Sequence, residues 1–168
     1  MKVGITGTTS GIGKHLKKHY SSAIEFNRND GDINDVSLVY EKLKNCDIFI
    51  NNAYHENCQS KLLDYFFNQW KDQHKKIITI GSSVCSYSPS GTGYEDYVDN
   101  KRELRQLHLD KVRLKTNCKS YLVNPGATDT PLVSDRMGKK LTTDDVVSII
   151  EFILNQKIYI PEIYFYAE

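Results

Sequence analysis

Short apolar runs alternate with segments of helical periodicity along the chain. The first run, residues 2–6, stops at a cluster of glycine, threonine and serine, and residues 12–20 then take on helical spacing. Residues 23–27 form a second apolar run, and residues 36–43 after it carry apolar side chains one helical turn apart. This order predicts a strand, a tight turn and a helix, followed by a second strand and a second helix.

The alternation continues to the end of the chain. Residues 47–51 and 76–80 have apolar centres, which is typical of strands buried on both faces of a parallel sheet. Two more strands and three helices complete the pattern: strands at residues 120–123 and 162–166, and helices at residues 61–73, 95–109 and 142–154. The pattern predicts a Rossmann-type α/β fold, a doubly wound parallel sheet of about seven strands in three α/β/α layers, with residues 1–168 as one domain.

Composition narrows the function classes. The chain has 168 residues, 39% hydrophobic and 26% charged, and a formal net charge of +1. Such a chain can bury a sizeable core, and so small a charge does not favour nucleic acid as a partner. No apolar run approaches the roughly 18–20 residues that a membrane-spanning helix needs. With no signal-like segment at the start and no C-x-x-C pair, we expect reduced thiols, no metal site and a cytoplasmic protein; the cysteines are Cys46, Cys58, Cys85 and Cys118.

Three glycines lie in the turn between the first strand and the first helix, within residues 6–13, Thr-Gly-Thr-Thr-Ser-Gly-Ile-Gly. Gly7 permits a tight turn, Gly11 allows the backbone to approach phosphates, and Gly13 lets the helix pack closely on the strand. The helix dipole and the free N–H groups of such a turn suit a pyrophosphate. An ordinary glycine-rich turn is the alternative, but the position after a strand and before a helix favours dinucleotide binding.

The spacing T-G-x-x-x-G-I-G differs from G-x-G-x-x-G and resembles the turn of the short-chain dehydrogenases/reductases. The order of the later motifs resembles this family over nearly the whole chain. The resemblance implies an enzyme that transfers hydride between a nicotinamide dinucleotide and a small molecule. The cofactor contacts that it implies in the turn are Gly7, Thr9, Ser10, Gly11 and Ile12.

The residues after the second strand bear on the choice of cofactor. About 20 residues after the glycine turn, enzymes that use NAD usually place a carboxylate against the ribose 2′-hydroxyl, whereas a 2′-phosphate needs a cation. Here the sequence has Asn27 and Arg28, and the guanidinium would form a bidentate pair with that phosphate, so NADP(H) is favoured over NAD(H). Many relatives that use NADP carry a second basic residue in the turn, where this chain has Ser10, and a solvated role for Arg28 stays open.

Two further segments resemble cofactor-binding segments of the family. Asp32 and Ile33 resemble the aspartate and apolar residue that contact adenine. Residues 51–53, Asn-Asn-Ala, resemble the N-N-A-G motif, with a tyrosine, Tyr54, in place of its glycine. The resemblance adds Asn52 and Ala53 to the implied cofactor contacts.

Tyr97 and Lys101 form a Tyr-x-x-x-Lys motif in a predicted helix, where this spacing puts both side chains on one face. A nearby ammonium stabilises a phenolate and lowers the pKa of the phenol. By the resemblance, Tyr97 is the general acid in reduction and the base in oxidation, and Lys101 also holds the nicotinamide ribose. Tyr94 has no lysine at the same spacing, which favours Tyr97.

A serine after the fourth strand is the third implied catalytic residue. By the resemblance, Ser83 orients the substrate carbonyl, and its hydroxyl donates to the oxygen on which charge develops. Ser82 is the alternative, and Ser86 and Ser88 add hydroxyls to the same loop. Asn57 lies near the expected place of the family's fourth catalytic residue, but a helix-capping role is equally open.

Residues 125–130 resemble the family's P-G-x-x-x-T segment, in which the threonine binds the nicotinamide carboxamide. The resemblance gives this role to Thr130 and adds Pro125, Gly126 and Thr128 to the implied cofactor contacts. A plain turn after a strand accounts for the proline and glycine but not for a threonine at that offset.

The chain is shorter than is usual in the family. A third strand is almost lost at residues 28–32, as in the dehydrorhamnose reductases and other sugar-nucleotide members. Residues 131–141 leave room for only a short substrate lid, so we expect an open pocket. Arg136, Lys139 and Lys140 in this stretch would attract an anionic substrate or simply face solvent.

Together these residues predict an NADP(H)-dependent oxidoreductase that acts on a carbonyl or alcohol group of a small molecule. Two alternatives stay open. The first is a noncatalytic dinucleotide-binding sensor, which would be expected to have lost catalytic residues, whereas Ser83, Tyr97 and Lys101 are present. The second is an epimerase or reductase-like enzyme of nucleotide sugars, against which the missing C-terminal substrate domain counts. The resemblance also implies a homodimer in which two chains pair through the helices at residues 61–73 and 95–109. The sequence alone does not test this pairing.

Overall fold

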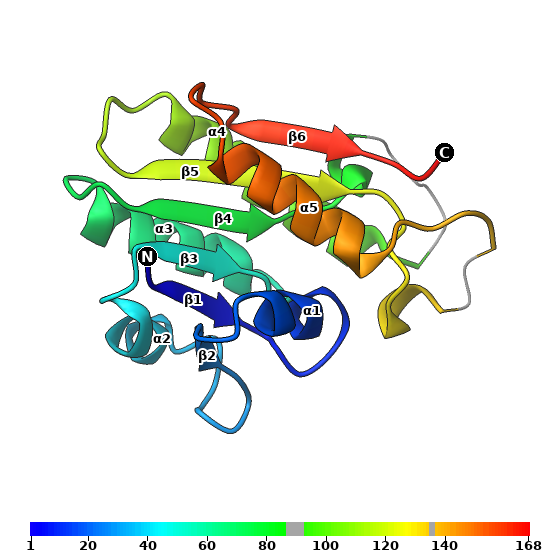
Figure 1. Cartoon of the computed structure of the whole chain (residues 1–168), viewed down its shortest axis with the longest axis horizontal. Coiled ribbons are helices and arrows are strands. Elements are labelled where there is room, and N and C mark those ends of the chain that lie inside the picture. The colour runs from blue at the N-terminus through cyan, green and yellow to red at the C-terminus, as the bar shows by residue number, and fades with distance from the viewer. Residues whose placement is uncertain (87–92, 135–136) are drawn as a thin grey trace.

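The computed structural model describes residues 1–86, 93–134 and 137–168. In these residues six strands form one parallel sheet in the order β2-β1-β3-β4-β5-β6 (Figure 1). The strands are β1 Val3–Thr6, β2 Ile24–Phe26, β3 Ile48–Asn51, β4 Lys76–Ile80, β5 Lys119–Pro125 and β6 Glu162–Phe165. The helices are α1 Gly11–His19, α2 Val36–Leu43, α3 Cys58–Trp70, α4 Glu95–Val112 and α5 Thr143–Leu154, with short 3-10 helices η1 Ser83–Ser86 and η2 Pro131–Val133.

Two apolar cores on opposite faces of the sheet produce the three layers. On one face, α1 and α5 cover strand residues that include Ile5 and Ile50, both fully buried. On the other face, α2, α3 and α4 cover Phe49 and Ile77, which are also fully buried. Figure 1 shows α5 in front of the sheet and α3 and α4 behind it. Because successive side chains of a strand point to opposite faces, strands that are apolar on both faces require helices on both sides.

The carboxyl ends of all six described strands lie along one edge of the sheet, at the right of Figure 1. The register pairs Thr6 with Phe26 and Asn51 with Thr79 at this edge. The glycine turn, the Asn-Asn-Ala segment, the serines and the Pro-Gly segment each follow directly after one of these ends. In sheets of this type ligands bind outside the carboxyl ends of the strands.

The structure confirms the predicted class and the parallel sheet, but the prediction of about seven strands was wrong by one strand among the described residues. Residues 28–30 form a turn instead of a strand remnant. The Asp30 N–H donates to the Asn27 carbonyl oxygen at 2.8 Å, and the Asp30 carboxylate accepts the Asn27 N–H at 2.8 Å. Backbone groups closed into a turn are not available for a ladder, so β2 remains an edge strand of the described sheet.

All the predicted helices occur; α2 has the bounds given by the apolar pattern, and the ends of the others are shifted. The largest shift is at α3, which begins at Cys58, and Asn57 is its N-cap residue without a side-chain capping bond. Helix α5 begins with a capping box, in which the Thr142 hydroxyl accepts the Asp145 N–H at 3.1 Å and the Asp145 carboxylate accepts the Thr142 N–H at 2.7 Å. Among the described helices, none is both long enough and apolar enough to cross a membrane.

Phe66 is at the centre of an aromatic cluster that joins α2, α3 and β3. Its ring stacks on Phe49 with centroids 4.0 Å apart and meets Trp70 edge to face at 5.1 Å. The side chain is fully buried. We expect Phe66→Ala to lower the free energy of unfolding by about 3–5 kcal/mol, because it removes apolar contacts and leaves a cavity. Urea denaturation followed by circular dichroism measures the loss.

Phe152→Ala is the matched control, since the Phe152 side chain is 48% exposed. We expect this variant to lose less than about 1 kcal/mol. Equal losses of free energy of unfolding in the two variants would contradict the burial of Phe66 in the core.

Candidate functional site

The glycine turn between β1 and α1 depends on conformations and contacts that favour glycine. Gly7 has a φ of 72° and Gly11 a φ of 51°, both in the left-handed region. A Cβ on Gly13 would lie 1.9 Å from the Gly7 carbonyl oxygen, so only glycine allows α1 to approach the turn this closely. The N-terminus of α1, whose first N–H groups have no partner within the helix, therefore lies beside the end of β1.

The other predicted residues of the turn surround this N-terminus. Thr9 and Ser10 are exposed, and Ile12 is half-buried against the core. Ser10 is the N-cap residue in an extended conformation, but its side chain makes no capping bond. The backbone N–H groups at the start of α1 are therefore not capped by the Ser10 hydroxyl.

The segment after β3 is bonded to the glycine turn. The Thr6 hydroxyl oxygen accepts the N–H groups of Asn52 and Ala53 at 3.0 and 3.1 Å. The Asn52 amide donates to the carbonyl oxygens of Thr6 and Gly7 at 3.1 and 3.0 Å. A Cβ on Gly7 would lie 2.8 Å from that of Ala53. The structure thus brings Asn52 and Ala53 against the turn.

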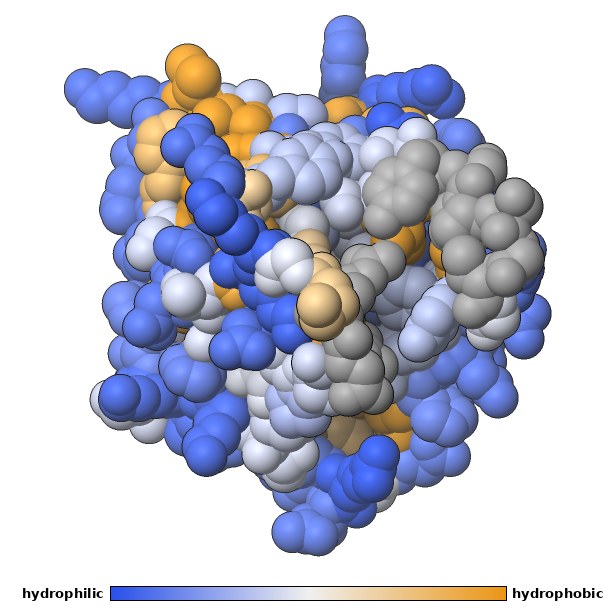
Figure 2. Space-filling view, turned by 90° about the vertical axis from the view of Figure 1, so that its right-hand side faces the viewer, coloured by the Kyte–Doolittle hydropathy of each residue, from blue (hydrophilic) through white to orange (hydrophobic). Residues whose placement is uncertain are grey.

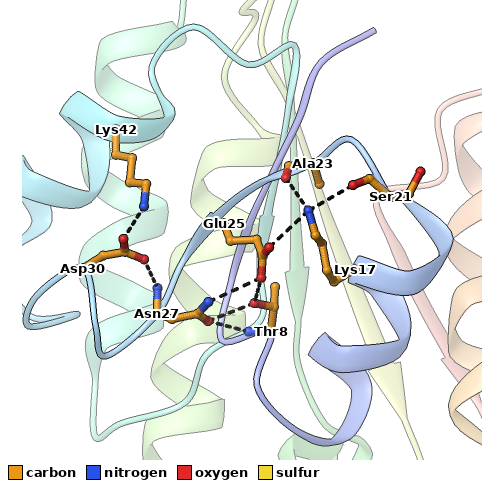
Figure 3. Close-up of polar contacts among 8 residues, drawn as sticks. All are labelled: Thr8, Lys17, Ser21, Ala23, Glu25, Asn27, Asp30 and Lys42. Atoms are coloured by element: carbon orange, nitrogen blue, oxygen red, sulfur yellow. Dashed lines mark hydrogen bonds and ion pairs between the residues drawn. The ribbon is translucent and has the colours of Figure 1, made fainter.

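Thr8 joins the glycine turn to the end of β2 (Figure 3). Its N–H donates to Asn27 Oδ1 at 2.9 Å, and its hydroxyl is within hydrogen-bond distance of the Glu25 carboxylate and of Asn27 Oδ1. Lys17 of α1 forms an ion pair with Glu25 at 3.1 Å and donates to the Ala23 carbonyl oxygen at 2.8 Å. The hydrogen bond from Thr8 is the main reason that the pKa of Glu25 is below its ordinary value.

Arg28 follows this cluster and is exposed. The Asp30 carboxylate nearby forms an ion pair with Lys42 of α2, and this bond lowers the pKa of Asp30 (Figure 3). Among the described residues, Arg28 has no ion pair. Because Glu25 and Asp30 each have a lysine partner, neither carboxylate is engaged by Arg28.

The predicted adenine contacts lie in the loop between β2 and α2. The Asp32 carboxylate accepts the Asn34 N–H at 2.9 Å, and Ile33 packs against the core under α2. Asn34 Nδ2 lies 3.3 Å from His55 Nδ1, which connects this loop to the segment after β3. Asp32 and Ile33 therefore lie near the Asn-Asn-Ala segment.

Tyr97 and Lys101 are adjacent on α4, and Tyr54 lies beside them. Lys101 Nζ is 5.5 Å from the centroid of the Tyr97 ring and 5.2 Å from that of the Tyr54 ring. The two rings meet edge to face with centroids 4.9 Å apart, and the Tyr54 hydroxyl accepts a bond from Asn100 at 3.4 Å. Tyr94, the alternative tyrosine, is 64% exposed at the N-cap of α4.

Lys101 is 4% exposed and is held by neutral groups. Its ammonium donates to Gln59 Oε1 at 2.5 Å and to the Ile80 carbonyl oxygen at 3.0 Å. No carboxylate of the described chain lies within ion-pair distance of it. Burial therefore lowers the pKa of Lys101 to about 7, although the neighbouring thiols of Cys58 and Cys85 oppose the shift.

The candidate serines lie in and before η1, which packs against α4. Ser83 is 5% exposed at the start of η1. Ser82 donates its N–H to Asn124 Oδ1 at 3.1 Å, and the Ser86 hydroxyl donates to the Ser83 carbonyl oxygen at 2.7 Å. Ser88 lies outside the described residues. The packing of η1 on α4 brings the segment of Ser83 to the helix that carries the Tyr-x-x-x-Lys pair.

The segment after β5 reaches the glycine turn from the other side. A Cβ on Gly11 would lie 3.3 Å from Thr130 Cγ2, so these two predicted residues are adjacent. Pro125 ends β5 and is buried, and the Thr128 hydroxyl donates to the Gly126 carbonyl oxygen at 3.1 Å.

Residues 131–134 and 137–141 are the described part of the stretch after this segment. Backbone hydrogen bonds of Leu141 at 2.7 and 2.8 Å join its end to the residues after β5. Lys139 is exposed, and Lys140 donates to the Ser134 carbonyl oxygen at 3.1 Å. Arg136 lies outside the described residues. Within the described chain no group of His, Cys, Asp or Glu side chains is arranged to hold a metal ion.

The described candidate residues therefore lie in the segments that follow the carboxyl ends of the strands. Figure 2 shows the molecule from this side, and the visible surface is mostly hydrophilic with small apolar areas. Sequence reasoning missed Thr8, Glu25 and Gln59. Gln59 had a detectable signal, because it precedes Leu62, Leu63 and Phe66 at the spacing of a core-facing helix position, where a polar side chain needs a partner.

The architecture matches solved structures over nearly the whole chain. A short-chain dehydrogenase/reductase from Vibrio parahaemolyticus superposes with a TM-score of 0.77 at 18% identity, covering 99% of each chain. A short-chain dehydrogenase from Burkholderia cenocepacia in complex with NADP has a TM-score of 0.76 at 16% identity, covering 97% of this chain and 86% of that one. The 3-alpha-hydroxysteroid dehydrogenase of a Pseudomonas species, complexed with NADH, has a TM-score of 0.73 at 18% identity, covering 99% and 95%.

At these identities the likeness shows a shared Rossmann-type fold. No protein-family model and no curated protein sequence matches the chain.

The lowered pKa of Lys101 has a consequence for stability. Between its folded pKa of about 7 and the value of about 10.4 in an unfolded chain, the unfolded state binds the proton more often, so the free energy of unfolding rises with pH. Lys101→Met removes this contribution. We expect the stability of the wild type relative to Lys101→Met to rise by up to about 1.4 kcal/mol per pH unit between about pH 7 and 9, measured by urea denaturation.

Lys115→Met, at an exposed position, is the control and should show the pH dependence of the wild type. A difference between wild type and Lys101→Met that stays constant over this range would mean that Lys101 keeps its proton in the folded protein.

Proposed function

We propose that the chain is a shortened short-chain dehydrogenase/reductase that transfers hydride between NADP(H) and a carbonyl or alcohol group of a small molecule. The observation that carries this proposal is the buried ammonium of Lys101 beside the Tyr97 ring, on a helix packed against the serine segment. A buried lysine without a carboxylate partner in the described chain is costly to desolvate. A purely structural role does not account for that cost, whereas stabilisation of a phenolate does.

The glycine turn fits a dinucleotide. Gly13 leaves no space for a Cβ, and the start of α1 is not capped by the Ser10 side chain. The free N–H groups there need acceptors, and pyrophosphate oxygens supply them. Thr130 beside Gly11, and Asn52 and Ala53 beside Gly7, would hold the rest of the cofactor. When bound, the nicotinamide dinucleotide supplies or accepts the hydride.

Proton transfer is assigned to the Tyr97 hydroxyl. In reduction it would donate a proton to the substrate oxygen, and in oxidation it would take one from the alcohol. The Lys101 ammonium stabilises the phenolate that this donation leaves, and a negative charge near Nζ in turn favours the protonated form of Lys101. The Ser83 hydroxyl would donate to the substrate oxygen as its charge develops.

The preference for NADP(H) follows from the charges at the end of β2. Glu25 and Asp30 are compensated by Lys17 and Lys42, which leaves the Arg28 guanidinium for a 2′-phosphate. Among the similar structures, one is a complex with NADP and another a complex with NADH. The shared fold is therefore compatible with either cofactor, and the preference rests on Arg28.

The first test is calorimetric titration with NADPH and NADH. We expect Arg28→Ala to raise the Kd for NADPH by about 10- to 100-fold, the effect of losing a charge-assisted bidentate contact, and to change the Kd for NADH less than about twofold. Arg113→Ala is the control and also removes an arginine side chain. Arg113 is the C-cap residue of α4 and its side chain is 73% exposed, so this variant should change neither Kd. Equal weakening of both cofactors by Arg28→Ala would assign Arg28 another role, and no binding of either cofactor would refute the proposed function.

The second test concerns Tyr97. We expect Tyr97→Phe to lower kcat by about 10²- to 10⁴-fold, because it removes the group that transfers the proton, while the Kd for NADPH changes less than about twofold. NADPH oxidation with a panel of aldehydes and ketones measures the rate. Tyr94→Phe is the comparison and should retain wild-type activity. Loss of activity in Tyr94→Phe with retention in Tyr97→Phe would reverse the assignment, and binding without turnover of any carbonyl would favour the sensor alternative.

A further inference from the structure

Glu162 in β6 is the centre of a set of polar contacts behind the candidate catalytic residues. Its side chain is 14% exposed and accepts bonds from Arg105 Nε at 2.7 Å and Nη2 at 3.1 Å. It also accepts bonds from Asn124 Nδ2 at 3.0 Å and the Tyr164 hydroxyl at 2.9 Å. Burial raises the pKa of Glu162, but the bonds from Arg105 and Tyr164 outweigh it and the pKa lies below its ordinary value. The carboxylate is therefore charged, with both oxygens engaged.

Asn124 connects this carboxylate to the serine segment. The Asn124 side chain is fully buried; its Nδ2 donates to Glu162, and its Oδ1 accepts the Ser82 N–H at 3.1 Å. A Cβ on Gly81 would lie 2.1 Å from the same Oδ1, so the amide sits directly against the turn that leads to Ser83. Cys85 adds a second link, since its Sγ lies 3.4 Å from the Tyr164 hydroxyl.

Arg105 connects the same carboxylate to α4. It follows Lys101 by four residues and Tyr97 by eight, which places the three side chains along one face of the helix. A bidentate pair fixes the direction of the guanidinium as well as its distance. The position of α4 relative to β6 is therefore fixed one turn beyond Lys101.

We propose that Glu162 is a positioning residue: through Asn124 it fixes the segment of Ser83, and through Arg105 it fixes the helix of Tyr97, so that the two hydroxyls keep one spacing. This inference rests on the proposed function. Two hydroxyls that act on one substrate oxygen must stay within a few tenths of an ångström of their places, and a displacement of about 1 Å costs on the order of 100-fold in rate. A single carboxylate bonded to both supports meets this need.

Glu151 provides a matched control. It also joins two elements, because it accepts the Tyr20 hydroxyl and lies 3.3 Å from His19 Nε2 across α1 and α5. Its contacts are on the opposite face of the sheet and include none of the catalytic candidates. Glu162→Gln and Glu151→Gln therefore remove the same charge from two links between elements, of which one leads to the site.

The first measurement needs no substrate. NMR hydrogen exchange of the Ser82 amide reports its bond to Asn124 directly. We expect Glu162→Gln to speed exchange at Ser82 and at the first turns of α4 by about tenfold or more, and Glu151→Gln to leave both unchanged. Unchanged exchange at Ser82 in Glu162→Gln would overturn the inference, whatever the activity of the protein.

The second measurement separates positioning from general stability. With NADPH and 4-nitrobenzaldehyde as the probe carbonyl, we expect Glu162→Gln to lower kcat about tenfold with the Kd for NADPH within about twofold of wild type. In a Ser83→Ala background the same substitution should lower kcat less than about twofold, because the spacing of the two hydroxyls no longer matters. Glu151→Gln should keep the wild-type kcat.

Faster exchange without loss of kcat would overturn the inference, and so would an equal loss of kcat in both backgrounds. Failure of the proposed function is recognised separately, since in that case the wild-type protein itself binds neither dinucleotide. Loss of kcat only where Ser83 is present, together with faster Ser82 exchange, is the result that supports the assignment.

Discussion

Parallel strands end in backbone groups that the neighbouring strands do not pair, and in this protein side chains from distant segments pair them. Thr6 accepts two N–H groups of the segment after β3, Gln59 donates to the Asn51 and Ile80 carbonyl oxygens, and Asn124 accepts the Ser82 N–H. A buried backbone group without a partner costs about 1–3 kcal/mol, so these bonds are required by the fold itself. The bonds of Thr6 and Asn124 each join two different strand ends, and Gln59 of α3 bridges the ends of β3 and β4. Satisfying the backbone therefore also fixes the glycine turn, the Asn-Asn-Ala segment and the serines relative to one another.

The same set of hydrogen bonds holds the Lys101 ammonium in the site. Lys101 shares the Ile80 carbonyl oxygen with Gln59 and donates to the oxygen of the same glutamine. A glutamate in place of Gln59 would neutralise the ammonium and remove the side-chain donor of the Asn51 carbonyl oxygen, while the Ile80 carbonyl oxygen would keep only the bond from Lys101. The neutral amide orients the lysine and does not quench its charge, which remains available to the tyrosine ring beside it. Because the buried ammonium has only neutral partners, the pKa of Lys101 is lowered.

Much of this arrangement could be predicted from local sequence. Alternating periodicity and glycine punctuation predicted the six described strands and the five α-helices, because these features depend on neighbours within one or two turns. The contacts of Gln59 with Lys101 and of Arg105 with Glu162 join residues 42 and 57 positions apart, and only the packing of the helices on one another and on the sheet brings them together. The sequence predicted that a third strand is almost lost at residues 28–32, but it did not reveal the turn that the Asp30 carboxylate closes there. Tyr54 was visible as a replacement for glycine, but its place against the Tyr97 ring was not.

The lost strand explains how the chain is short and yet keeps its site. β2 has three residues and forms one edge of the described sheet, so the end of β2 lacks the ladder that a further strand would provide. Ion pairs with the flanking helices replace it: Lys17 of α1 holds Glu25, and Lys42 of α2 holds Asp30. A charged side chain on a short edge strand, here Glu25 of β2, also disfavours pairing with a second chain. The central strands β1, β3, β4 and β5 keep two neighbours each, and the segments after them carry the glycine turn and Ser83. Shortening at this edge therefore removes strand pairing only beside β2, where the adenosine end of a dinucleotide is expected. The strands that precede the residues proposed to move the proton keep both of their neighbours.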